Sequence, residues 1–246
     1  MSEAKKAIIL DCDGVVILGS NELLREVIDD TLEEINARVN PAAKDVIIEE
    51  RWGIGFDDLL RELLSGHPRL ISRAIKSFKE RVEEALATGP IRTPQGVPAL
   101  LEEAAADSSI ALFINTASPR HALETIAMPR FGIDPEWFDE IVCAEDFPPH
   151  QTKPAPDTIF HILRTHDLSA TNAIMVGDST NDVQAALMSG IEPAVVLTGN
   201  IHEDELDEVV DFSVRPENIF PNVNEFLLKH ALGRTSMHST IRPLLI

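Results

Sequence analysis

Four aspartates in two well-separated segments have the spacing that a phosphoryl-transfer site requires. Asp11 and Asp13 come directly after one short apolar run, and Asp178 and Asp182 follow another. A carboxylate at a strand end can attack phosphorus, and a second carboxyl group beside it can hold a proton for the leaving alkoxide. Carboxylate oxygens are also the ligands that Mg²⁺ prefers. We therefore predict a metal site in which Asp11 and Asp178 are direct ligands and Asp182 binds the ion directly or through water.

Three further positions could bind the phosphoryl group. Thr116 ends another apolar run, and its hydroxyl together with the backbone N–H of Ala117 could hold a phosphoryl oxygen. Lys153 precedes a predicted helix, where its ammonium could neutralise both the nucleophile and the phosphoryl charge. Each residue alone has an ordinary explanation as a turn, a helix cap or a solvated lysine. Only their occurrence together with the four aspartates, in this order along the chain, supports the prediction of a phosphoryl-binding site.

Short apolar segments alternate with helix-like segments along most of the chain. This alternation predicts an α/β fold with a doubly wound parallel sheet, because strands covered on both faces are continuously apolar. The expected strands are Ala7–Leu10, Ile110–Ile114, Ile141–Ala144, Ala173–Val176 and Ala194–Leu197, with a weaker one at Phe212–Val214. The expected helices between them are Val97–Ala106, Arg120–Met128, Pro156–His166 and Asn181–Ser189.

One interval interrupts the alternation with an inserted helical subdomain. Residues 18–88 contain no convincing strand, and helical periodicity appears at 21–39, 56–64 and 70–86. We therefore predict a helical cap over 18–88, a core over 1–17 and 89–232, and a C-terminal tail over 233–246. The segment 51–56 is either a specificity loop, in which Arg51 contacts substrate, or a helix–helix turn with buried aromatic residues.

Composition narrows the possible partners. The chain has 246 residues and a formal net charge of −20, which disfavours nucleic acid and anionic membrane surfaces. Two cysteines, Cys12 and Cys143, are too few for a disulfide framework. No apolar stretch is long enough to span a bilayer, and the first residues show no signal-peptide pattern. We expect a cytoplasmic protein, monomeric or homodimeric.

The chain thus has four motifs: Asp11 with Asp13, Thr116, Lys153, and Asp178 with Asp182. In this order they resemble the motifs of the haloacid dehalogenase superfamily, within its group of phosphoglycolate phosphatases and beta-phosphoglucomutases. The resemblance extends to the segments around the motifs, Pro94-Gln95-Gly96-Val97, Lys153-Pro154-Ala155-Pro156-Asp157 and Gly177-Asp178-Ser179. It implies a Rossmann-like core with an α-helical cap that closes over the site.

The resemblance also implies roles for the site residues. Asp11 is the expected nucleophile, Asp13 the general acid/base, and Mg²⁺ the cofactor, with the backbone carbonyl of Asp13 as an additional metal ligand. The implied function is Mg²⁺-dependent hydrolysis of a small phosphorylated metabolite through an aspartyl-phosphate. Asp13 argues against dehalogenation, because dehalogenases of the superfamily lack this second acid.

Two alternative functions remain at this point. A phosphomutase would transfer the phosphoryl group within a sugar phosphate, although the stretch 16–24 lacks the histidine that such mutases carry there. A non-catalytic binding protein of the same fold is the other alternative, but every chemical position of the four motifs is filled. The first cap hinge, which follows Asp13, is unusually apolar for the superfamily.

Overall fold

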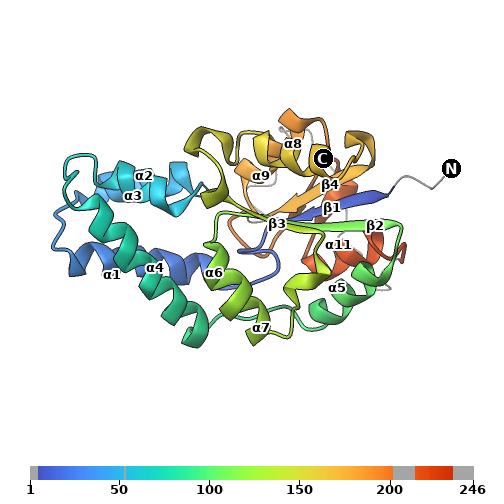
Figure 1. Cartoon of the computed structure of the whole chain (residues 1–246), viewed down its shortest axis with the longest axis horizontal. Helices are drawn as coiled ribbons and strands as arrows, with labels where there is room; N and C mark the ends of the chain where they lie inside the picture. The colour runs from blue at the N-terminus through green and yellow to red at the C-terminus, as the bar shows by residue number, and fades with distance from the viewer. Residues whose placement is uncertain (1–4, 53, 202–213, 235–246) are drawn as a thin grey trace, which may run out of the picture.

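The computed structural model describes residues 5–52, 54–201 and 214–234, and within them a parallel six-stranded sheet lies at the centre (Figure 1). The strand order is β3-β2-β1-β4-β5-β6. The strands are β1 (Lys6–Leu10), β2 (Ile110–Thr116), β3 (Glu140–Cys143), β4 (Ala173–Gly177), β5 (Glu192–Val196) and β6 (Ile219–Phe220). The predicted doubly wound α/β fold is confirmed, and β1 to β5 coincide with the five apolar runs to within two residues.

The weaker strand predicted at 212–214 does not coincide with the sixth strand of the described residues. Residues 212 and 213 of that prediction lie outside the described residues, and Val214 is not in a strand. The described sixth strand is β6, which pairs with β5 through Val195↔Ile219 and Val196↔Phe220. A two-residue strand is too short to show an apolar run.

Helices cover both faces of the sheet, as the continuous burial of the strands requires. Alternate residues of β1 separate into two clusters, because successive side chains of a strand point to opposite faces. Ala7 and Ile9 pack with residues of α8 (Asp157–Thr165) and α9 (Thr180–Ser189). Ile8 and Leu10 belong to the cluster that includes α5 (Val97–Ala106) and α11 (Val223–His230).

The predicted helix over 120–128 forms as one helical segment of three parts. It comprises α6 (Arg120–Ala122), a π-helical turn (Leu123–Ala127) and α7 (Met128–Arg130). The segment packs on α4 (Ile71–Thr88) of the insert, and its buried residues belong to the same hydrophobic cluster as residues of β1 and β2. It therefore connects the sheet to the inserted helices.

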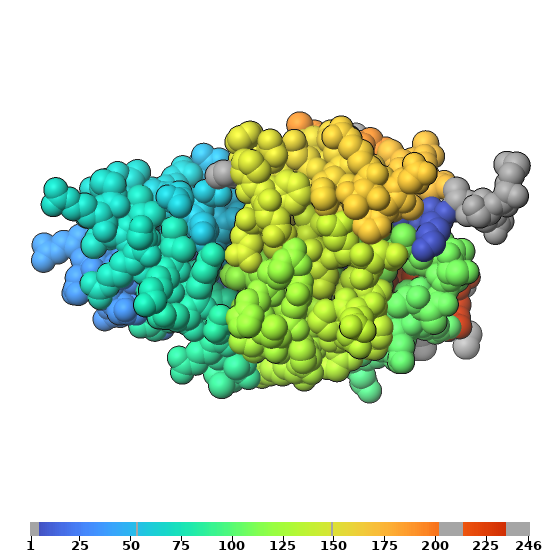
Figure 2. Space-filling model, viewed as in Figure 1, coloured from blue at the N-terminus to red at the C-terminus, as the bar shows by residue number. Residues whose placement is uncertain are grey.

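Four helices of the insert gather at one end of the molecule (Figures 1 and 2): α1 (Ser20–Glu34), α2 (Pro41–Arg51), α3 (Phe56–Leu63) and α4 (Ile71–Thr88). Helix α1 packs on α4, and α3 packs on both α2 and α4. Their shared interior contains the fully buried Leu24, Ile28, Leu60 and Phe78. All four helices fall inside the range predicted for a cap, whose boundaries stay a prediction.

The two chain crossings between sheet and insert lie side by side. The backbone N–H of Leu18 donates to the carbonyl of Arg92 at 2.7 Å, and the N–H of Arg92 donates to Leu18 at 3.0 Å. The entering and leaving segments are thus held together where the insert begins.

Among the described residues, no helix has both the length and the apolar character needed to cross a bilayer.

Candidate active site

The sheet order brings the two acidic segments together. Strands β1 and β4 are neighbours with Leu10 opposite Val176, and the N–H of Asp11 donates to the carbonyl of Val176 at 2.9 Å. Asp178 follows β4 by one residue, so both carboxylates leave the sheet at the same edge. Strand β2 lies on the other side of β1 and ends at Thr116. The carboxyl edge of a doubly wound sheet is where such folds bind ligands.

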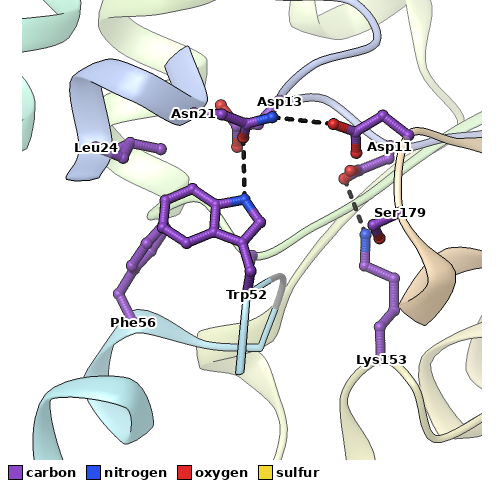
Figure 3. Close-up of a pocket in the computed structure, with 10 residues that line it drawn as sticks. Asp11, Asp13, Asn21, Leu24, Trp52, Phe56, Lys153 and Ser179 are labelled. Carbon is purple, nitrogen blue, oxygen red and sulfur yellow. Dashed lines mark hydrogen bonds and ion pairs between the residues drawn. The ribbon is translucent and has the colours of Figure 1, made fainter. Parts of the chain in front are cut away.

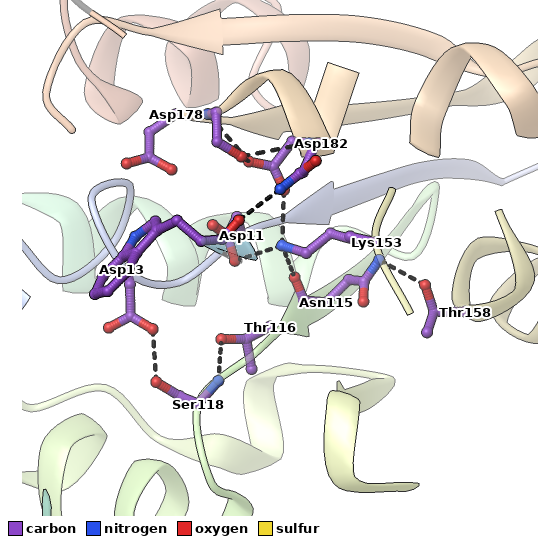
Figure 4. Close-up of polar contacts among 12 residues, drawn as sticks. Asp11, Asp13, Asn115, Thr116, Ser118, Lys153, Thr158, Asp178 and Asp182 are labelled. Carbon is purple, nitrogen blue, oxygen red and sulfur yellow. Dashed lines mark hydrogen bonds and ion pairs between the residues drawn. The ribbon is translucent and has the colours of Figure 1, made fainter. Parts of the chain in front are cut away.

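Three buried carboxylates form a compact cluster at this edge (Figure 4). One oxygen from each of Asp11, Asp178 and Asp182 lies within 4.8 Å of the others. Asp182 is held in the first turn of α9 by a capping box: its Oδ2 accepts from the N–H of Ser179 at 3.1 Å, and its own N–H donates to Ser179 Oγ at 3.4 Å. Helix capping thus orients one member of the cluster.

Lys153 supplies the positive charge of the cluster. Its Nζ lies 2.9 Å from Asp11 Oδ1 and 2.7 Å from Asp182 Oδ1, and it donates to the carbonyl of Asn115 at 3.0 Å. These three contacts use all three ammonium donors. Burial alone would lower the pKa of Lys153, but Asp11 and Asp182 outweigh this effect and raise the pKa. The side chain is therefore a permanent cation.

Asp178 is fixed by neutral donors. Its Oδ2 accepts hydrogen bonds at 2.9 Å from Asn21 Nδ2 and from both the N–H and Nδ2 of Asn200. Two glycines permit this close approach: a Cβ at Gly14, whose φ is +77°, would lie 2.0 Å from Asp178 Oδ2, and one at Gly199 would lie 1.8 Å from it. A side chain at either position would displace the carboxylate.

The electrostatics of the cluster fit a divalent cation. Burial, followed by repulsion from Asp182, raises the pKa of Asp178 to about 7. Burial also raises the pKa of Asp11 well above its ordinary value, although the Lys153 ammonium opposes this. Three converging carboxylates and one ammonium leave uncompensated negative charge, and carboxylate oxygens suit Mg²⁺. The residues present therefore fit a bound metal ion.

Asp13 occupies a different part of the site. Its Oδ2 accepts from Ser118 Oγ at 2.5 Å, and the N–H of Ser118 donates to Thr116 Oγ1 at 3.1 Å. Burial raises the pKa of Asp13, and the Ser118 hydrogen bond opposes that increase. The environments of Asp11 and Asp13 thus differ: an ammonium neighbours the first, and hydroxyl groups neighbour the second.

The insert closes the site from above (Figure 3). Asn21, Leu24, Trp52 and Phe56 line a cavity of about 20 Å³ together with the acidic residues, Lys153, Ala117 and Ser179. Trp52 Nε1 donates to Asn21 Oδ1 at 3.2 Å, and its backbone carbonyl accepts from Asn181 Nδ2 at 2.5 Å. This space is about that of one water molecule. A substrate would have to separate Trp52 from the core.

The predicted site residues are therefore not all in one place. Asp11, Asp13, Ala117, Lys153 and Asp178 line the cavity, and Asp182 is not a lining residue but contacts Lys153 at 2.7 Å. Thr116 is buried at the strand end, where its hydroxyl accepts from Ser118. Arg51 does not line the cavity; its side chain is 49% exposed and its Nε lies 2.8 Å from Glu62. The substrate-binding roles stay predictions.

Three polar residues at the site were not singled out from the sequence: Asn21, Ser118 and Asn200. All are uncharged, and none lies at a strand end with a carboxylate. Asn21 could have been suggested by its position in the sequence, because it is a polar residue at the start of the insert, where the apolar hinge ends. Trp52 and Phe56 are buried, as expected for a helix–helix turn, and they also line the cavity, as expected for a specificity loop.

Fold and site together define an enzyme class: a doubly wound α/β protein with an Asp–Lys cluster at the carboxyl edge of its sheet, beneath a helical lobe. The chain belongs to the haloacid dehalogenase-like hydrolase family, whose model matches residues 8–196. The resemblance that the four motifs indicated is confirmed, as is the prediction of an enzyme.

Curated relatives carry related names, and solved structures share the fold. A phosphoglycolate phosphatase of Vibrio cholerae is 28% identical over 193 residues, which cover 75% of this chain and 81% of the relative. The crystal structure of a predicted phosphoglycolate phosphatase from Haemophilus somnus matches with a TM-score of 0.70 at 22% identity, covering 92% of this chain and 98% of the other. A CbbY mutant from Rhodobacter sphaeroides, in complex with xylulose-(1,5)bisphosphate, matches at a TM-score of 0.72 and 20% identity, covering 90% and 96%.

Proposed function

We propose that this protein is a Mg²⁺-dependent phosphatase that hydrolyses the phosphate monoester of a small metabolite. The observation that carries the proposal is the buried cluster in which Lys153 lies 2.9 Å from Asp11 and 2.7 Å from Asp182, with Asp178 in the same cluster. Relatives named phosphoglycolate phosphatase support hydrolysis of a phosphate ester. A cytoplasmic setting and a monomeric or homodimeric state belong to the same proposal.

Asp11 is the proposed nucleophile. Its carboxylate attacks phosphorus, the bond to the ester oxygen breaks, and the phosphoryl group is carried as an aspartyl-phosphate until water releases it. The Lys153 ammonium favours the ionised form of Asp11 and offsets the charge on the phosphoryl oxygens. Asp11, Asp178, Asp182 and the backbone carbonyl of Asp13 would hold Mg²⁺, which supplies further charge stabilisation at those oxygens.

Asp13 is the proposed proton carrier. Burial raises the pKa of Asp13, and a protonated carboxyl group can donate to the leaving alkoxide. The ionised form can then accept a proton from the water that attacks the aspartyl-phosphate. Ser118 holds this side chain by a 2.5 Å hydrogen bond, away from the carboxylate cluster. The two aspartates thus have separate roles because they have separate neighbours.

The test is turnover of para-nitrophenyl phosphate and of a broad phosphate-ester panel, with Mg²⁺ and with EDTA. We expect Mg²⁺-dependent release of phosphate by the wild type and none by Asp11→Asn. Asp45→Asn is the matched control, because that side chain is 71% exposed on α2. Absence of turnover with every ester would refute the proposal, and full activity in Asp11→Asn would refute the assignment of the nucleophile.

A further inference from the structure

We infer that the preferred substrate is a phosphate ester whose alcohol portion is uncharged and largely apolar. This inference rests on the proposed phosphatase function and deepens it. Its basis is the part of the cavity wall that the insert provides. Among the described residues that line the cavity, the insert contributes three apolar side chains, Leu24, Trp52 and Phe56, and one amide, Asn21. None of them carries a charge.

The polar groups of this wall are already paired. Asn21 Nδ2 donates to Asp178 Oδ2 at 2.9 Å, and Asn21 Oδ1 accepts from Trp52 Nε1 at 3.2 Å. The indole N–H has no second proton to offer. Admission of a substrate separates Trp52 from the core and frees its indole N–H, but it adds no cation to this wall. A carboxylate or second phosphate on the substrate would therefore meet mainly apolar surface, and burial of an uncompensated anion is strongly unfavourable.

The floor of the cavity cannot accept a second anion either. Lys153 is the one cationic side chain among the described lining residues, and its three donors are taken. A divalent cation and the Lys153 ammonium together would formally only balance the three carboxylates of Asp11, Asp178 and Asp182. The phosphoryl group adds two negative charges of its own. A third would be repelled at short range in a water-poor site.

Nearby cations of the insert are directed elsewhere. The Arg25 guanidinium stacks on the Trp52 ring, 4.3 Å from its centroid, and is not a lining residue. Lys79 and Arg61 lie in an adjoining cleft that shares Phe56 and Ala117 with the cavity. The Nζ of Lys79 already forms ion pairs with two carboxylates, at 3.5 Å from Asp57 Oδ2 and 3.2 Å from Glu145 Oε2. The cavity itself therefore presents aromatic and aliphatic surface to the leaving alcohol.

Two matched substrate pairs test the inference on the unmodified protein. Benzyl phosphate and 4-carboxybenzyl phosphate differ by a remote carboxylate, and the methylene insulates the ester oxygen from it. 2-Hydroxyethyl phosphate and 2-phosphoglycolate make the same comparison with two carbons. We expect kcat/KM to be at least about tenfold higher for the uncharged member of each pair, which corresponds to about 1.4 kcal/mol of transition-state stabilisation.

A variant tests the cause of the preference. Leu24→Lys places a cation on the wall, and Leu24→Met is its neutral control. In folded Leu24→Lys, verified by circular dichroism, the ratio of kcat/KM should shift about tenfold toward the charged substrates, and Leu24→Met should not shift it. Comparable or higher kcat/KM for the charged esters in the wild type would overturn the inference while the phosphatase function stands. Turnover of other esters of the panel but of none of these four would also overturn the inference, whereas absence of turnover across the whole panel would remove the phosphatase proposal itself.

Discussion

Replacing Asp178 by asparagine should stabilise the metal-free protein. Asp178 is 2% exposed, and its Oδ2 accepts three hydrogen bonds that an asparagine Oδ1 can also accept. The substitution keeps the shape of the side chain and removes its charge. The expected gain is the stability that the metal-free protein loses because burial and Asp182 disfavour the ionised form of Asp178 in the folded state.

The size of the gain follows from proton linkage. The ordinary pKa of aspartate is 3.8, and burial with the neighbouring Asp182 raises the pKa of Asp178 to about 7. Below pH 3.8 the group is protonated in both states and costs nothing. As pH rises toward 7, only the unfolded chain releases the proton, so the free energy of unfolding falls. The loss is about 2 kcal/mol at pH 5.5 and about 4 kcal/mol at pH 8.

Urea unfolding in EDTA at pH 5.5 and pH 8 measures this gain. Asp178→Asn should be more stable than the wild type at both values, by more at pH 8, and Asp45→Asn should change stability by less than about 0.5 kcal/mol. Added Mg²⁺ should raise the melting temperature of the wild type and do so far less for Asp178→Asn. Equal or lower stability of Asp178→Asn at pH 8 would show that the cluster carries no electrostatic strain.

Three further substitutions test other contacts of the site. Lys153→Met leaves two buried carboxylates without their cation and should cost about 3 to 5 kcal/mol in urea unfolding at pH 8; a loss below about 1 kcal/mol would contradict the ion pairs. Gly199→Ala, with a Cβ 1.8 Å from Asp178 Oδ2, should abolish the Mg²⁺-dependent rise in melting temperature, whereas Gly66→Ala, with no atom within 4 Å of its Cβ, should retain it. Trp52→Phe leaves Asn21 Oδ1 without its donor and should lower stability by about 1 to 3 kcal/mol; an unchanged urea midpoint would argue against that hydrogen bond.

The sheet and the charged part of the site could be predicted because both leave a local signal in the sequence. A strand buried on both faces is a run of apolar residues, and the polar residue that ends it marks the sheet edge. Asp11 and Asp178 were found in this way. Their actual contact depends on the pairing of β1 with β4 in the register Leu10↔Val176, which no local sequence pattern predicts.

Other features left no such signal. Helix α2 buries only Ile48, so its sequence shows no apolar stripe from which to predict it. Asn21 and Asn200 act on Asp178 from positions 157 and 22 residues away, through contacts that only the tertiary fold creates. Contact of Arg51 with substrate was one of two interpretations of the segment 51–56 and stays a prediction; in this structure the Nε of Arg51 lies 2.8 Å from Glu62 on α3. An ion pair between neighbouring helices depends on how they pack.

The central position of β1 has a consequence for folding during synthesis. Its two partners are β2, which begins at Ile110, and β4, which begins at Ala173. At ribosomal rates of about 5 to 20 residues per second, β1 waits roughly 10 to 30 s for β4 to be made. The helices α1 to α4 can fold in that interval through local contacts, which form faster than distant strand pairs. The nascent chain carries an apolar strand with two open edges until β2 is made and with one open edge until β4 is made, and such an edge is a site for chaperone binding or for aggregation.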